Sequence, residues 1–131
     1  MSSKLFGVLI VGLTLLTAGC REEVSSEGEA VVCTTEYVPA ISVRVFDKET
    51  GAAIACGVTV LLVDGNFSEE LIIDDNQCDD YFTFTGAGER SGNYDVSVTK
   101  EGYTEWMQYD VEVSSNLCHV NTKSLQAYLE K

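Results

Sequence analysis

The sequence predicts an all-β domain, with its strands arranged as a sandwich or a barrel, and three observations support this prediction. From residue 40 onward, several segments alternate apolar and polar side chains with a period of two. Turns that contain glycine, aspartate or asparagine separate these segments at intervals of roughly ten residues. No window in this part of the chain has the roughly 3.6-residue period of an amphipathic helix.

The first predicted strands lie before an acidic loop near residue 77. Residues 41–46 alternate Ile, Val and Val with Ser, Arg and Phe, and they end at the turn 47–51. Residues 58–63 form a continuous β-branched and apolar run, which is typical of a central strand. Residues 67–73 follow the turn 64–66, so these two segments predict a β-hairpin.

The remaining predicted strands follow the acidic loop. Residues 81–85 alternate aromatic residues with threonine, and residues 94–99 alternate Tyr, Val and Val with polar residues. Residues 104–113 and 119–129 complete the series. In the last segment the apolar residues change face after Val120, which predicts a β-bulge at that point.

The first 19 residues have the pattern of a secretory signal. Lys4 precedes an apolar block over residues 5–16, and small residues stand directly before Cys20. The block is shorter than the roughly 20 apolar residues that span a bilayer, which favours a cleaved signal over a retained transmembrane helix. The pattern resembles the signal of bacterial lipoproteins, which implies that Cys20 becomes the acylated first residue, with palmitate among the acyl chains. Thr17 stands where Leu is most usual, so ordinary secretion with a free Cys20 is the alternative.

The predicted organisation has three parts. A helical signal peptide occupies residues 1–19, acylated Cys20 with a flexible tether occupies residues 20–37, and one β-sandwich domain occupies residues 38–131. The tether is predicted because residues 21–30 are polar, rich in Ser, Glu and Gly, and without apolar periodicity. Arg21, which stands where aspartate would signal retention, favours the outer membrane of the bacterial cell envelope as the location.

The charge of the chain excludes nucleic acid as a partner. The formal net charge is −13, and it becomes −14 for residues 20–131, because Lys4 is the single charged residue before Cys20. Binding to phosphates requires a basic face, which such a chain lacks. The excess of carboxylates could attract cations or basic partners, or it could keep an exported domain soluble.

Four cysteines follow Cys20, and their even number predicts two disulfides in an oxidising compartment. Sequence reasoning alone leaves three pairings of these cysteines open.

Several short motifs resemble those of carboxypeptidase regulatory-like domains. They are Val-Arg-Val-Phe-Asp-Lys-Glu-Thr-Gly at 43–51, Gly-Val-Thr-Val at 57–60, Gly-Asn-Tyr-Asp-Val at 92–96 and Gly-Tyr at 102–103. The resemblance covers about residues 38–131, and it implies a seven-stranded, Greek-key-type β-sandwich of the transthyretin-like (prealbumin-like) kind. The metallocarboxypeptidase catalytic module is absent, since the sequence has no His-x-x-Glu pair. The resemblance therefore implies a binding or structural module and not an enzyme.

Residues 89–94 together with residues 118–120 also resemble a set of uncharacterised bacterial lipoproteins.

The resemblance to transthyretin-like sandwiches also implies how the cysteines pair. In these sandwiches the first strand runs parallel to a late strand, and Cys33 and Cys118 each precede such a strand, so they are expected to bond. The predicted hairpin brings the residue before it near the residues after it, which favours a bond between Cys56 and Cys78.

The sequence contains residues that could form three kinds of chemical site: catalytic, zinc and calcium. His119 is the single histidine, and its neighbour Cys118 is expected to be oxidised, so neither catalysis nor a zinc site is predicted. The sequence predicts no cofactor, with bound calcium as the alternative. One loop carries several carboxylates, which are ligands for calcium, although the loop lacks the EF-hand pattern. The calcium candidates are Asp74, Asp75, Asp79 and Asp80.

Two further groups are candidates for binding. An aromatic cluster follows the Gly-Tyr turn and could form a recognition patch or fill the core. Its members are Tyr103, Trp106 and Tyr109. Arg90 could bind a carboxylate ligand, but an internal partner such as Glu89 or Asp95 is the preferred interpretation.

The sequence therefore predicts a membrane-anchored lipoprotein of the cell envelope, with a non-catalytic β-sandwich and either an envelope protein or a glycan as its partner. A calcium- or carbohydrate-binding surface module is the alternative.

Overall fold

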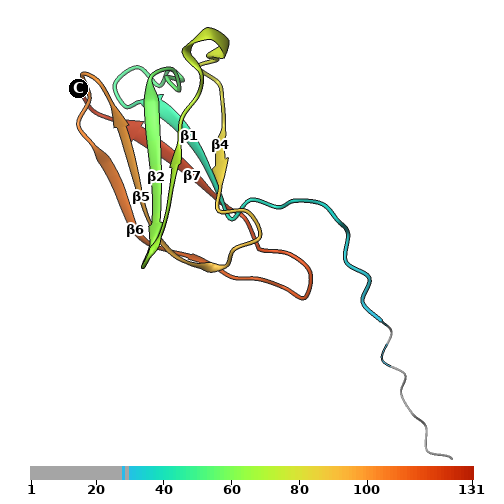
Figure 1. Cartoon of the computed structure of the whole chain (residues 1–131). Coiled ribbons are helices and arrows are strands. Elements are labelled where there is room, and N and C mark those ends of the chain that lie inside the picture. The colour runs from blue at the N-terminus through green and yellow to red at the C-terminus, as the bar shows by residue number, and fades with distance from the viewer. Residues whose placement is uncertain (1–27, 29) are drawn as a thin grey trace, which may run out of the picture. The chain divides into compact units, whose positions relative to one another are not determined.

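Seven β-strands in two sheets make up the domain over residues 31–131 (Figure 1). The computed structural model describes residues 28 and 30–131 of the chain. The predicted signal peptide, Cys20 and residues 21–27 and 29 of the tether lie outside the described residues. Among the residues described, no helix has the length and apolar character needed to span a membrane. The prediction of an all-β, two-sheet sandwich is confirmed.

The smaller sheet has three strands in the order β4-β1-β7. Strand β1 (Ile41–Asp47) lies in the centre, antiparallel to β4 (Phe84–Gly86) and parallel to β7 (Lys123–Leu129). The parallel register runs without interruption from Ile41 opposite Lys123 to Asp47 opposite Leu129. Parallel neighbours require a long crossover connection, which the second sheet provides here.

The larger sheet has four antiparallel strands in the order β3-β2-β5-β6. They are β2 (Val58–Asp64), β3 (Phe67–Leu71), β5 (Gly92–Lys100) and β6 (Trp106–Val113). Gly65 and Asn66 alone connect β2 to β3, and Gly65 has a φ of +56°, a conformation that two-residue hairpin turns require and that glycine adopts without strain. The predicted hairpin is therefore present.

The core lies between the two sheets and is built from alternate residues of the strands. In β1, β2 and β5 the buried positions recur with a period of two. The sequence alternation predicts this for β1 and β5, whereas β2 was predicted from a continuous apolar run. The largest fully buried side chains are Tyr94, Phe84, Ile41, Leu62 and Leu129.

Strand β4 is shorter than the predicted segment 81–85. It begins at Phe84, and Tyr81 and Phe82 are exposed instead of alternating into the core. The carboxylate of Asp79 accepts a hydrogen bond from the backbone N–H of Tyr81 at 2.9 Å, so the chain still turns at this point. A short 3-10 helix, η1 (Asp75–Gln77), precedes this turn.

The predicted bulge after Val120 is wrong. Strand β7 begins at Lys123, and Val120 instead forms an isolated bridge with Ser115 across the loop before the strand. The apolar residues change face there because the segment is two elements and not one interrupted strand.

An irregularity of register occurs instead between β5 and β6. There Tyr109 and Asp110 together oppose Asp95. Asp110 has a φ of +54°, and its N–H donates to the Asp95 carboxylate at 3.1 Å.

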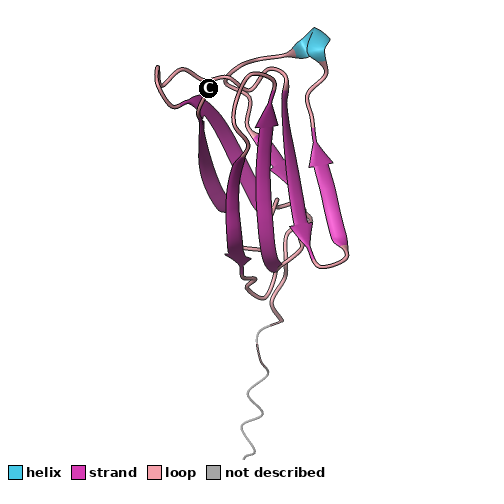
Figure 2. Ribbon diagram, turned by 90° about the vertical axis from the view of Figure 1, so that its left-hand side faces the viewer, coloured by secondary structure: helices cyan, strands magenta, loops and turns pink. Residues whose placement is uncertain are grey.

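The sandwich has two ends that differ in what they carry. Strand β1 begins at one of them, the proximal end, which consists of residues 31–40 and the connections 65–66, 87–91 and 114–122. The distal end consists of the connections 48–57, 72–83 and 101–105, followed by residues 130–131. Figure 2 shows helix η1 at the distal end, with residues 31–40 approaching from the opposite side.

Asp47 closes the distal end of β1 and is the one buried charged side chain among the residues described, with 3% of its surface exposed. Its carboxylate accepts hydrogen bonds from the N–H groups of Thr50 at 3.0 Å and Glu49 at 2.8 Å, and from the Tyr103 hydroxyl at 2.8 Å. The Nζ of Lys131 lies 3.6 Å away. The hydrogen bond from Thr50 and then that from Tyr103 contribute most to lowering the Asp47 pKa from 3.8 to about 2.

The lowered pKa predicts how the stability of the domain depends on pH. Because ionised Asp47 is favoured in the fold, its contribution is fully present above pH 3.8 and is lost as the pH falls through about 2. Asp47→Asn should lower the melting temperature by at least about 5 °C at neutral pH, and the difference from the parent should shrink toward pH 2. Thermal unfolding across this pH range measures both effects, with Glu49→Gln as the control in the same turn. A difference that stays constant with pH would refute this role.

Candidate functional site at the proximal end

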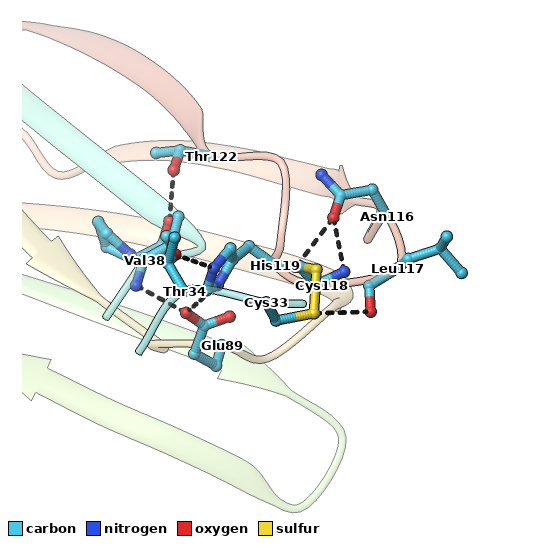
Figure 3. Close-up of polar contacts among 10 residues, drawn as sticks. Cys33, Thr34, Val38, Glu89, Asn116, Leu117, Cys118, His119 and Thr122 are labelled. Carbon is cyan, nitrogen blue, oxygen red and sulfur yellow. Dashed lines mark hydrogen bonds and ion pairs between the residues drawn. A yellow bond between two sulfur atoms is a disulfide. The ribbon is translucent and has the colours of Figure 1, made fainter. Parts of the chain in front are cut away.

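A disulfide between Cys33 and Cys118 joins the segment before β1 to the connection between β6 and β7 (Figure 3). The two Cα atoms are 5.2 Å apart, although 85 positions separate them in sequence. A second disulfide joins Cys56 to Cys78 at the distal end. Both bonds have the pairing that the resemblance implies.

His119 lies beside this disulfide and connects two other segments. Its Nε2 atom is hydrogen-bonded to the hydroxyl of Thr34 at 2.9 Å, and its Nδ1 atom is hydrogen-bonded to the carboxylate of Glu89 at 2.8 Å. Figure 3 shows the imidazole between these two side chains. His119 is not a strand residue, because β7 begins four residues later.

Glu89 holds the segment before β1 through two backbone contacts. Its carboxylate accepts the N–H of Val38 at 2.8 Å, and its own N–H donates to the carbonyl of Val38, also at 2.8 Å. The hydrogen bond from Val38 is the main reason that the pKa of Glu89 is lowered, and the hydrogen bond with His119 acts in the same direction. Glu89 has a φ of +53°, which is uncommon for a residue other than glycine.

Asn116 shapes the loop that presents His119. Its side-chain oxygen accepts hydrogen bonds from the backbone N–H groups of Cys118 at 2.8 Å and His119 at 2.9 Å. The backbone N–H of Asn116 donates to the carbonyl of His119. Asparagine commonly stabilises turns in this way. The loop therefore has a defined conformation in which the disulfide and the imidazole both face residues 33–38.

Two more contacts fasten the same segment. The hydroxyl of Thr122 donates to the carbonyl of Pro39 at 2.6 Å. The ring of Tyr37 lies directly on Gly88, where a Cβ atom would come within 1.7 Å of it. Residues 33–39 are thus held by a covalent bond, side-chain hydrogen bonds and ring packing. We name this set of contacts the junction.

Within the junction, hydrogen bonds link a hydroxyl to an imidazole and the imidazole to a carboxylate, at the distances found in a catalytic triad. The Glu89 oxygen that contacts His119 also accepts the N–H of Val38, so the same atoms fix the backbone. Cys118, the thiol next to the histidine, is oxidised in the disulfide. These contacts directly explain how residues 33–39 are attached to the domain.

Three of the four aspartates of the calcium hypothesis accept hydrogen bonds from separate backbone groups, and the fourth, Asp75, is the first residue of helix η1. Asp74 caps helix η1 by accepting the N–H of Asn76, while Asp79 accepts the N–H of Tyr81 and Asp80 accepts that of Cys56. Among the residues described, no three His, Cys, Asp or Glu side chains gather closely enough to hold a metal ion.

The structure does not bring the three aromatic candidates together on the surface. Tyr103 donates its hydroxyl to Asp47, Trp106 packs partly buried against the core, and Tyr109 is 64% exposed. Trp106 instead lies in a groove with Tyr128, a residue that the sequence did not indicate.

This groove has a volume of about 290 Å³ and lies near the distal ends of β6 and β7. Aromatic and charged side chains line it together: Lys48, Thr104, Glu105, Trp106, Tyr128 and Glu130. Lys48 and Glu130 form an ion pair within it. Aromatic walls with hydrogen-bonding groups between them suit a small polar ligand that has an apolar face.

Arg90 has internal partners, as the preferred interpretation held, but they are not the residues named from the sequence. Its guanidinium donates to the carboxylate of Asp64 at 2.6 Å and to the hydroxyl of Tyr94 at 3.1 Å. The same group lies 4.2 Å from the centroid of the Phe67 ring. The hydrogen bond to Asp64 contributes most to the raised pKa of Arg90.

No protein-family model and no curated protein matches the sequence. Among solved structures, the chain is similar to a protein from Bacteroides uniformis ATCC 8492 that is provisionally named a carbohydrate binding protein. The identity is 12% and the TM-score is 0.42. The match covers 70% of this chain and 42% of that protein, so the chain spans less than half of its length.

Sequence reasoning missed the network of Thr34, His119 and Glu89. One signal could have found part of it, because Thr34 and His119 each follow a cysteine of the implied pair. No pattern indicated Glu89 as the third member, since its position depends on the unusual backbone conformation of the connection 87–91.

Proposed function

We propose that this chain is a lipoprotein of the bacterial cell envelope, and that its β-sandwich is a non-catalytic binding or structural module held at the membrane by acylated Cys20. The outer membrane is the proposed location. The module would present its surface to an envelope protein or a glycan within reach of the membrane. The two disulfides suit an exported domain of this kind.

The junction is the observation that supports this proposal best. In a lipid-anchored chain, residues 33–39 connect the anchor to the domain, so any force between the membrane and the domain passes through them. Cys33 and Cys118 place a covalent bond where such a force enters, and the contacts of Glu89 and His119 reinforce it.

Substitution of the acylated cysteine tests the proposal. In cells supplied with labelled palmitate, the parent chain should carry label and sediment with membranes, whereas Cys20→Ser should lose both properties. The physical reason is that stable attachment requires two or more acyl chains, which only Cys20 would provide.

The matched control is the double variant Cys33→Ser and Cys118→Ser, which also removes cysteines but should keep the label. Label that persists in Cys20→Ser, or a parent chain without label, would contradict the proposal.

Carbohydrate binding is the second candidate function, and the groove with Trp106 and Tyr128 favours it. Its aromatic walls could pack on the apolar face of a sugar ring, while Glu105 and Glu130 could accept hydrogen bonds from hydroxyl groups.

A further inference from the structure

Three aliphatic side chains of the proximal segments are exposed. Val31, Val32 and Leu117, which we name the proximal tip, are 61%, 89% and 85% exposed. Val32 and Leu117 directly precede the two bonded cysteines, so their Cα atoms lie within about 13 Å of each other. In Figure 3 the side chain of Leu117 points away from the hydrogen-bonded cluster.

The two ends of the sandwich differ strongly in charge. The distal connections and the C-terminal residues 130–131 hold eight Asp or Glu residues and two lysines. The proximal segments hold only Glu36, Glu89 and Arg90, together with His119. Glu89 is paired with His119, and Arg90 is paired with Asp64 of strand β2. The proximal tip therefore lies at the end of the domain that carries little charge.

The length of the preceding chain limits what the proximal tip can meet. Ten residues separate Cys20 from Val31, so full extension places the tip at most about 40 Å from the anchored cysteine. Two groups joined by a linker of this length are at millimolar effective concentration relative to each other. The bilayer surface is thus always within reach, whereas a soluble partner must arrive by diffusion.

We infer that the proximal tip docks on the surface of the bilayer that holds the anchor. This inference rests on the proposed function and adds an orientation to it. Exposed aliphatic side chains enter the boundary between headgroups and acyl chains, and the near-neutral proximal end can approach anionic lipids that repel the carboxylate-rich distal end. Docking therefore turns the distal end, with its groove, away from the membrane.

Tryptophan reporters test the orientation in the acylated protein. Leu117→Trp places a reporter on the proximal tip, and Ile72→Trp places a matched reporter on a residue that is 65% exposed at the acidic distal end. Each protein is reconstituted in vesicles of phosphatidylethanolamine and phosphatidylglycerol with brominated acyl chains, which quench tryptophan on contact. The parent chain, whose single tryptophan is Trp106, gives the background.

Quenching of L117W should exceed that of I72W at least about threefold after subtraction of the background. Equal or weaker quenching of L117W in protein that sediments with the vesicles would overturn the docking and leave the anchor in place. Protein that stays in the supernatant would overturn both the anchor and the docking.

Discussion

Removal of the Cys33–Cys118 disulfide should lower the free energy of unfolding by about 4–5 kcal/mol. The bond closes a loop with a sequence separation of 85, so breaking it restores much conformational freedom to the unfolded chain. The double variant Cys33→Ser and Cys118→Ser, unfolded in urea, measures the loss. The double variant should also lose the hydrogen bond between Thr34 and His119, because these residues follow the two cysteines that the disulfide holds together.

The second disulfide provides the control for this prediction. Cys56 and Cys78 are 22 positions apart, so the variant Cys56→Ser and Cys78→Ser should lose only about 3 kcal/mol. A larger loss at the distal bond than at the proximal one would contradict the loop-closure explanation.

Tyr94→Ala should cost about 4 kcal/mol, which is comparable to the loss of a disulfide. Tyr94 is fully buried in β5, and its ring packs edge-to-face on Phe67 with centroids 6.2 Å apart. Its hydroxyl donates to the carbonyl of Arg90 at 2.6 Å and accepts from the Arg90 guanidinium. Alanine would leave a cavity in the core and remove both hydrogen bonds.

Tyr94→Phe separates the two contributions. It keeps the ring and removes the hydroxyl, so it should cost only about 1 kcal/mol. Urea unfolding of both variants checks the ratio. If phenylalanine cost as much as alanine, the hydrogen bonds to Arg90 would dominate and the packing explanation would be wrong.

The alternation of apolar residues was sufficient to predict most of the strands. In β1 and β5 each buried apolar position follows from the period of two, because the two-sheet arrangement buries one face of each strand. The continuous apolar run of β2 predicted a central strand but not which of its residues are buried. The pattern failed where local hydrogen bonds determine the backbone. Asp79 stabilises a turn by accepting the N–H of Tyr81, and Asn116 stabilises the loop that contains His119. The segments that follow these two residues nevertheless have the composition of strands.

The site was less predictable because it depends on tertiary contacts. Glu89 reaches His119 through a positive φ that no sequence pattern for glutamate indicates. The groove brings Lys48 together with Trp106 and Tyr128, which are far apart in sequence and are joined only by the packing of the two sheets. By contrast, the disulfide pairing followed from the topology that the resemblance implied.

The mass of the N-terminal peptide of membrane-extracted protein tests the central claim most directly. Trypsin cleaves after Arg21, so the expected product is the dipeptide of Cys20 and Arg21, with a diacylglyceryl group on the cysteine sulfur. An N-terminal peptide that begins elsewhere, or one with an unmodified Cys20, would contradict the assignment of this chain as a lipoprotein.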